Sequence, residues 1–252
     1  MKEIKILYLY PDILDLYGDI GNIKVLEYRT KKRGFSCQID TYSIGDTAPN
    51  FSEYDIVFSG GGADNEQKIL SEDLVKYKKE IKKAIKEGVF FLLICGSYQL
   101  FGKYYKGVEG NIIPGLEIFN YYTEAIADRK KRCIGNIIIE TMLDGEETKI
   151  IGFENHGGQT FDTRENFGTV LYGNGNKFGD LSEGFKTKNV IATYLHGPLL
   201  SKNPKLADHI IKYALERKYN EKVILETLDD TFENKAREQL IERFIESKRT
   251  LI

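Results

Sequence analysis

The sequence predicts an α/β protein in which a mostly parallel, open sheet is flanked by helices. Two observations carry this prediction. Short runs rich in Ile, Val, Phe and Tyr alternate with longer amphipathic, charged segments in the N-terminal part of the chain. The run VFFLLI at 89–94 is apolar throughout, which is typical of a strand covered on both faces. The chain of 252 residues, 41% hydrophobic and 29% charged, has enough apolar side chains for a sizeable core.

The N-terminal elements alternate between strand and helix. Strands are predicted over 4–10, 36–44, 54–62 and 89–94, and helices over 21–34 and 71–88. Gly34 closes the first helix. The second has Ser71 as its cap, lysines in its later turns and Gly88 at its end. Side chains that follow the ends of parallel strands meet at one edge of the sheet, so we expect the functional site there.

The rest of the chain is richer in strands. These are predicted over 135–142, 149–154, 168–173 and 189–197, and two helices near 203–219 and 229–248 follow them. In the last helix, Phe232, Ala236, Leu240 and Phe244 recur at near-helical spacing. This pattern favours packing on the protein's own domain, with contact to a partner as the alternative. No Pro- or Ser-rich linker divides the chain, so we expect a single domain over 1–252.

Composition excludes several classes of function. The net charge of −2 favours neither nucleic-acid nor membrane binding, and no apolar stretch is long enough to span a membrane. The N-terminus MKEIKILYLYPDI resembles a first strand more than a signal peptide. The three cysteines, Cys37, Cys95 and Cys133, are widely spaced and indicate neither a disulfide framework nor a metal site. Free thiols suit a reducing cytosol, so we expect a cytoplasmic protein.

Cys95 is the first candidate for chemistry. It ends the apolar run FFLLIC, and the small residues Gly96 and Ser97 open the helix expected after it. A thiol at such a strand-to-helix turn lies at the positive end of the helix dipole, which stabilises a thiolate. The Gly96 N–H would point towards the space beside the sulfur. Free cysteine is also among the most buried residue types, so a purely structural Cys95 is the alternative.

A glycine loop and two histidines are candidates to assist a thiolate. The loop 60–62 exposes backbone amides that can bind an anion or oxyanion, unless it is only a flexible turn. It lacks the GK[ST] ending of a nucleotide-binding P-loop. His156 and His196 each end an apolar run, and by position either could serve Cys95 as a base; the alternative is a loop histidine with local hydrogen bonds. His209 lies in a helical pattern and is expected to be structural or solvated.

These motifs together resemble a known family. The chain resembles class I glutamine amidotransferases, and is closest to their cobyric-acid-synthase-like branch. The similar motifs, in chain order, are GGGADNEQ, CGSYQLFG, GFENHGG and YLHGPLLSKNP. LYGDIGN at 16–22 and the chain length narrow the resemblance to the glutaminase subunits of bacterial lipid II isoglutaminyl synthases. The resemblance covers essentially the whole chain and implies a flavodoxin-like amidotransferase domain.

The resemblance also implies roles for individual residues. Cys95 matches the nucleophile that attacks the side-chain amide of glutamine, and His196 matches its base and acid. Gly96 and a glycine of the 60–62 loop, with Gly61 as the first choice, match the backbone donors to the oxyanion. Arg129 matches an arginine that holds the substrate glutamine. The alternatives are one solvated charge in the basic run RKKR, or a match that is shifted by a few residues along that run. No metal is implied.

The sequence departs from the family pattern at three positions. Leu93 and Ser97 stand where the family has glycine, and Pro198 stands where many members carry the glutamate that completes a triad. Proline cannot orient an imidazole. The sequence therefore predicts a Cys-His dyad, with an acidic side chain donated by a partner protein.

The implied partner is an ATP-dependent, MurT-like ligase in a heterodimer. Ammonia from glutamine would let this Mur-ligase-like subunit amidate the D-glutamate of lipid II during peptidoglycan synthesis. No nucleotide-binding loop is evident, so no cofactor is expected in this chain, and ATP and magnesium are expected on the partner. One alternative is a glutaminase for another ammonia acceptor, such as a cobyrinate-type amidation. Another is a non-catalytic flavodoxin-like binding module with a vestigial site.

Overall fold

A central six-stranded sheet organises the protein, in a computed structural model that describes residues 2–62 and 64–246. Its strands, in spatial order, are β13 (Phe185–Lys186), β14 (Val190–Thr193), β4 (Phe90–Ile94), β3 (Ile56–Ser59), β1 (Glu3–Leu9) and β2 (Ser36–Tyr42). The pairings from β14 to β2 are all parallel, and β13 joins β14 in the antiparallel direction. The predicted mostly parallel α/β sheet is thus confirmed.

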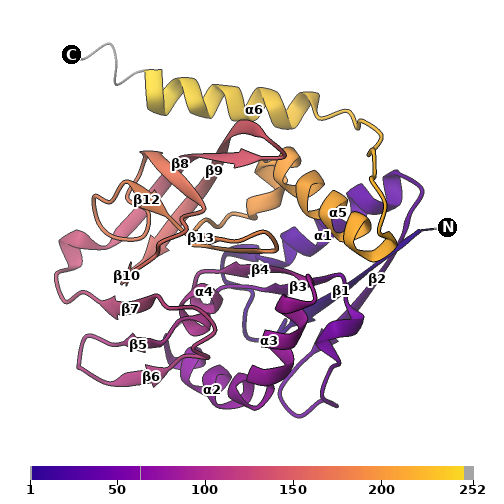
Figure 1. The fold of residues 1–252 in the computed structure, drawn as a ribbon. Helices are drawn as coiled ribbons and strands as arrows, with labels where there is room; N and C mark the ends of the chain where they lie inside the picture. Colours follow the sequence, from indigo (N-terminus) through magenta and orange to yellow (C-terminus); the bar gives the residue numbers. More distant parts are fainter. Residues whose placement is uncertain (1, 63, 247–252) are drawn as a thin grey trace.

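Helices cover both faces of this sheet (Figure 1). On one face, α1 (Ile20–Lys32) packs beside α5 (Pro204–Tyr219). The other face carries α2 (Asp64–Leu74), α3 (Lys78–Lys86) and the short α4 (Gly96–Phe101). Every residue of β4 is buried, as its apolar sequence predicts.

The helix predicted over 71–88 is wrong at its start. Helix α2 begins at Asp64, directly after the glycine loop, and a 3₁₀ turn at Val75–Tyr77 separates it from α3. Ser71 therefore lies inside α2, where its hydroxyl donates a hydrogen bond to the Pro114 carbonyl instead of capping a helix. Gly88 does follow α3 with a left-handed φ of 84°, as predicted.

Two further sheets extend the central one. One has the order β10-β7-β5-β6 and the other the order β12-β11-β8-β9. Their strands are β5 (Tyr104–Lys106), β6 (Ile112–Pro114), β7 (Tyr122–Ala125), β8 (Cys133–Leu143), β9 (Glu146–His156), β10 (Gly158–Phe161), β11 (Gly168–Tyr172) and β12 (Ser182–Glu183). The sequence predicts β8, β9 and β11 but not the others, which are two to four residues long and too short for a periodic pattern.

Strand β9 connects the sheet β12-β11-β8-β9 to the central sheet. Phe153 of β9 and His196, just beyond β14, exchange backbone hydrogen bonds of 3.1 and 2.9 Å. The end of β9, with Asn155 and His156, therefore lies beside the carboxyl end of β14. This contact brings the motifs GFENHGG and YLHGP together at the edge of the sheet where a site was expected.

The C-terminal region runs across the molecule and packs loosely. Arg29 of α1 forms two-pronged hydrogen bonds with Asp208 and Asp230, which fix the segment leading to α6 (Thr231–Ile241). Phe232 of α6 is 84% exposed, so its predicted packing on the domain is wrong, whereas Phe244 in η6 (Glu242–Glu246) packs against Tyr172. Residues 247–248 of the predicted helix lie outside the described residues.

No helix in the described part of the chain is both long and apolar enough to cross a membrane. The expectation of a single domain over 1–252 stays a prediction.

Candidate active site

Cys95 sits on a strained turn between β4 and α4. Its backbone has φ 50° and ψ −103°, which a residue with a side chain rarely adopts and which costs about 1–3 kcal/mol. The turn is held from both sides, because the Cys95 N–H donates to the Thr193 carbonyl at 2.8 Å and its carbonyl accepts from the Gln99 N–H at 3.1 Å. The expected strand-to-helix elbow is therefore present, and the thiol lines a cavity.

The glycine loop packs directly against this elbow. The Ser97 hydroxyl donates to the Gly60 carbonyl at 2.6 Å and also contacts the Ser59 hydroxyl at 2.6 Å. A Cβ at Gly96 would lie 3.2 Å from both the N and the O of Gly62, so a side chain there would crowd the loop. Ser97 thus fits a family position normally held by glycine because its hydroxyl ties the loop to the elbow.

His196 and Cys95 converge over Gly61. A Cβ added to Gly61 would lie 2.7 Å from His196 Cε1 and 3.2 Å from Cys95 Cβ. Only glycine leaves room for the imidazole to approach the cysteine. The His196 side chain is fully buried, and its Nε2 atom makes no hydrogen bond within residues 2–62 and 64–246. This nitrogen is therefore available for proton transfer at the thiol.

Asp19 places a carboxylate beside His196 that the sequence did not predict there. Its Oδ1 atom lies 3.4 Å from His196 Nδ1, and its Oδ2 atom accepts the Gly61 N–H at 2.8 Å. Asp19 is fully buried and immediately precedes α1, whose positive end stabilises a carboxylate. The chain thus brings Asp19 to His196 across 177 residues, which the predicted Cys-His dyad did not include; an acid donated by a partner stays a prediction.

The motif LYGDIGN positions Asp19, and Pro198 takes part. A Cβ on Gly21 would lie 2.2 Å from Pro198 Cγ, so the start of α1 rests on the proline ring. Asn22 Oδ1 accepts the Leu200 N–H at 2.9 Å and fixes the register of the two segments. Pro198, which stands where many family members have glutamate, thus packs against the segment that places Asp19 beside His196. The acidic residue inside LYGDIGN was the available signal for it.

Gly61 does not have the geometry of an oxyanion donor. Its N–H is already donated to Asp19, so the expectation for Gly61 is corrected on this physical ground. Gly62 lines the cavity next to Cys95, and its nitrogen faces Gly96. The candidate donor to the oxyanion is therefore Gly62, the next residue along the loop, which lies close to Gly96.

The surroundings of His196 favour its protonated form. Burial alone would lower its pKa, but the negative charge of the Cys95 thiolate and the contact with Asp19 outweigh burial and raise the pKa of His196 to about 10. A negative charge on Cys95 and a proton on His196 therefore stabilise each other. Tyr17 covers the His196 ring edge-on, with ring centroids 4.9 Å apart.

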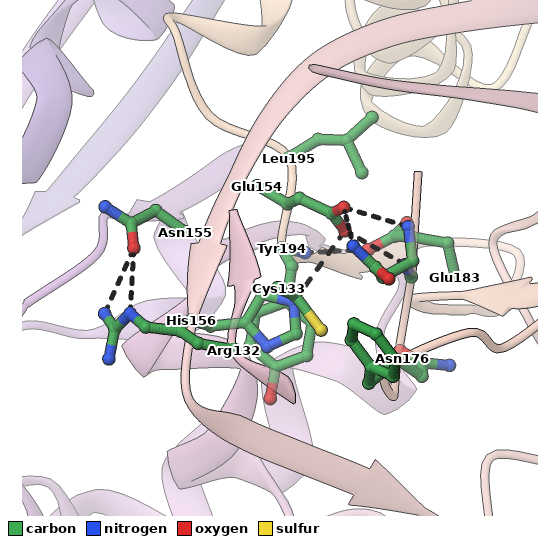
Figure 2. A network of polar contacts seen from close by, with 12 residues as sticks. Arg132, Cys133, Glu154, Asn155, His156, Asn176, Glu183, Tyr194 and Leu195 are labelled. Carbon is green, nitrogen blue, oxygen red and sulfur yellow. Dashed lines mark hydrogen bonds and ion pairs between the residues drawn. The ribbon is translucent and has the colours of Figure 1, made fainter. Parts of the chain in front are cut away.

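His156 lies in the same region but in a different state. It stacks flat on Tyr194, with ring centroids 3.6 Å apart, and its Nδ1 atom donates to the Gly158 carbonyl at 2.7 Å. Burial lowers the pKa of His156 to about 3, although Glu154 Oε2 lies 4.0 Å from its Nε2 atom. Figure 2 shows His156 between the Arg132–Asn155 contact and the buried Glu154. Of the two candidate bases, only His196 reaches Cys95.

The cavity beside Cys95 has a volume of about 430 Å³. Its lining residues come from the loops and strand ends described above: Tyr17, Gly62, Gln67, Cys95, Gln99, Tyr105, Val108, Ala125, Ile126, Arg132, Asn155, His156, Gly157 and Gly158. The third histidine, His209, lies in α5 and bonds Asp144 at 3.1 Å, away from this cavity. In the described residues, no group of three or more His, Cys, Asp or Glu side chains could hold a metal ion.

Arg132, not Arg129, faces the cavity. Arg129 is exposed in a 3₁₀ turn at Arg129–Lys131 and does not line it. The guanidinium of Arg132 donates to Asn155 Oδ1 at 3.1 and 3.2 Å, which holds it over Gly157 (Figure 2). The sequence alone could not show which basic residue of RKKR faces the cavity, because that depends on where β8 begins.

The sequence of this chain is similar to those of known proteins. Residues 5–204 match the family model of the CobB/CobQ-like glutamine amidotransferase domain. The chain is 40% identical to the lipid II isoglutaminyl synthase (glutamine-hydrolyzing) subunit GatD of Staphylococcus aureus, over 99% of this chain and all of that protein. It is 39% identical to the GatD of Streptococcus pneumoniae, over 94% of this chain and 90% of that protein.

More distant matches are shorter or share only the fold. A probable cobyric acid synthase of Methanococcus vannielii is 29% identical, but the match covers 60% of this chain and 33% of that protein. The structure of PurLQS from Thermotoga maritima superposes with a TM-score of 0.51 at 15% identity, over 88% of this chain and all of that chain. The family match and the near-full-length relatives together show that the chain belongs to the CobB/CobQ-like glutamine amidotransferases.

Proposed function

We propose that this protein hydrolyses glutamine to glutamate and ammonia, with Cys95 as the nucleophile. The observation that carries the proposal is the strained Cys95 turn, which places the thiol beside the buried His196 and next to a cavity of about 430 Å³. An imidazolium stabilises a thiolate by ion pairing, and the thiolate is the reactive form of cysteine. The cavity is large enough for one amino acid.

The first step forms a tetrahedral intermediate. The Cys95 thiolate attacks the side-chain carbonyl carbon of glutamine, and the carbonyl oxygen becomes an oxyanion. The backbone amides of Gly62 and Gly96, which lie on two segments packed against each other beside the thiol, stabilise that charge. Loss of one such donor typically lowers the rate by about 10²–10³.

His196 then moves protons in both halves of the reaction. It donates its proton to the departing nitrogen, and ammonia leaves as the γ-glutamyl thioester forms. The neutral ring next takes a proton from water, which attacks the thioester and releases glutamate. Asp19 holds the proton on Nδ1 and orients the ring, so that Nε2 faces the reacting atoms.

Arg132 and Asn155 bind the amino-acid end of glutamine. Arg132 is held at the cavity wall by Asn155, and a guanidinium pairs well with a carboxylate. This assignment replaces Arg129 and requires no cofactor in this chain.

The ammonia serves a MurT-like ATP-dependent ligase, with which this chain forms a heterodimer. That subunit carries ATP and magnesium and amidates the D-glutamate of lipid II, in the cytoplasm, during peptidoglycan synthesis. The near-full-length similarity to two GatD subunits supports this acceptor. A cobyrinate-type acceptor is the second candidate, but the cobyric acid synthases match this chain over only a part of their length.

The proposal is tested by glutamate release from glutamine, by the chain alone and with a MurT-like ligase, and by lipid II amidation measured by mass spectrometry. We expect both reactions in the assembled complex and neither with Cys95→Ala. Full activity of Cys95→Ala would contradict the proposal. Release of glutamate with no amidation of lipid II would leave the cobyrinate-type acceptor as the function.

A further inference from the structure

Gln67 is a buried polar residue of the cavity that the steps above do not use. It lies in the first turns of α2 and is 1% exposed, and its side chain lines the cavity with Cys95. Its Nε2 atom donates to Gln99 Oε1 at 2.7 Å. Its Oε1 atom has no hydrogen-bond partner within residues 2–62 and 64–246.

The position of Gln67 relates this free acceptor to the reacting atoms. A Cβ on Gly96 would lie 3.2 Å from Gln67 Nε2 and 3.2 Å from Gly62 N. The Gln67 amide therefore borders the two backbone groups assigned to the oxyanion. Gln99 holds its orientation, because Gln99 Nε2 in turn donates to the Tyr194 hydroxyl at 3.0 Å.

An unpaired acceptor in such a place is costly unless a ligand completes it. A buried carbonyl oxygen without a donor loses about 1–3 kcal/mol of hydration. The substrate carboxamide brings two N–H donors on the atom that leaves as ammonia. We propose that Gln67 Oε1 accepts an N–H of the substrate carboxamide and thereby selects an amide over an ester or a carboxylate. This assignment rests on the proposed glutaminase function.

Gln67 takes no part in covalent change in this account. The Cys95 Sγ–carbon bond forms, the carbon–nitrogen bond breaks, and the proton that completes ammonia comes from His196. The acceptor holds the nitrogen so that its lone pair faces that proton. Product glutamate has no N–H at this position and places a negative oxygen against Gln67 Oε1, which favours its release.

Two substrates separate this role from mere support of the fold. The full chain, assembled with a MurT-like ligase, is assayed with L-glutamine and with the γ-methyl ester of L-glutamate, whose leaving group has no N–H. For Gln67→Met we expect kcat/KM for glutamine to fall about tenfold, and that for the ester to stay within about twofold. An equal fall for both substrates, or no change for either, would overturn the proposal.

Two further variants complete the design. Gln159→Met is the matched control, because Gln159 is a buried glutamine that bonds Cys133 and Phe178 and does not line the cavity. It should leave the amide-to-ester ratio unchanged. Gln67→Glu keeps an acceptor oxygen, so a folded variant should retain the preference for amide; if it loses that preference, the assignment is wrong. It also serves if Gln67→Met does not fold.

Failure of this inference differs from failure of the proposed function. If the unmodified complex releases no glutamate from glutamine, the glutaminase proposal itself fails. If the complex is active and Gln67→Met keeps the unmodified amide-to-ester ratio, only the role of Gln67 fails.

Discussion

His196 and His156 are both buried at the edge of the central sheet, yet their surroundings shift their pKa values in opposite directions. His196 is 0% exposed with a pKa raised to about 10, and His156 is 3% exposed with a pKa lowered to about 3. Burial opposes charge on both rings. His196 has Cys95 and Asp19 beside it, whereas His156 has the flat ring of Tyr194 and a backbone carbonyl. An ionic partner, rather than burial, therefore sets the direction of the pKa shift of His196.

The largest expected effect comes from removing each ring in turn. His196→Ala should lower glutamate release by about 10⁴ or more, because nucleophile and base act as a unit. His156→Phe keeps a flat ring against Tyr194 and loses only the bond to the Gly158 carbonyl. It should retain activity within about tenfold and lose about 1–3 kcal/mol of stability. A steady-state assay measures the activity of each variant, and a denaturant titration measures its stability. Equal losses of activity in the two variants would contradict the difference proposed between the two histidines.

Asp19→Asn should have the next largest effect. The amide no longer favours the imidazolium, so the pKa of His196 falls and the ring loses its orientation. We expect kcat to fall about 10²–10⁴ and the alkaline limb of the pH–rate profile to move to lower pH. The matched control is Asp15→Asn, whose carboxylate is exposed and bonds the Ile20 N–H. A normal profile for Asp19→Asn would show that the acid comes from elsewhere.

The His156 side of the cavity is expected to bind rather than react. Arg132→Met should raise KM for glutamine about 10- to 100-fold with a smaller change in kcat, because it removes one charge-assisted contact to the substrate carboxylate. Arg129→Met is its control in the same basic run and should change KM less than about twofold, within the range of an exposed charge. The reverse ranking would restore Arg129 as the binding residue.

The smallest expected effect is on stability against pH, and the two histidines give opposite signs. The folded pKa of His156 lies below the unfolded value of 6.5, so its contribution is lost as pH falls from 6.5 to about 3. The folded pKa of His196 lies above 6.5, so its contribution is lost as pH rises from 6.5 to about 10. Each accounts for at most about 1.4 kcal/mol per pH unit. His156→Phe should flatten the acid side and His196→Ala the alkaline side in unfolding titrations; unchanged slopes would contradict both pKa shifts.

The fold was largely predictable where a hydrophobic pattern extends over many residues. The apolar run at 89–94 and the glycines that end helices gave β4, α1 and the parallel sheet directly. Strands of two to four residues carry too few side chains for a pattern, so the added sheet of β5, β6, β7 and β10 was missed. These strands are recognised only through their pairing partners.

The site was predictable where one segment carries the chemistry and not where distant segments meet. Cys95 and its turn lie within a single strand-to-helix motif. Asp19 was missed because it joins His196 only through the packing of Gly21 on Pro198. The choice between Gly61 and Gly62 depends on which amide Asp19 binds, which no local pattern records.

The central claim is that this chain itself holds His196 as an imidazolium between Cys95 and Asp19. With only three histidines, an NMR titration of the imidazole nitrogens can follow each ring, assigned with His196→Ala and His156→Phe. We expect His196 to be still protonated at about pH 8 and His156 to be neutral, and we expect Asp19→Asn to lower the pKa of His196. If His196 titrates near its ordinary value in both the unmodified chain and Asp19→Asn, the account is contradicted.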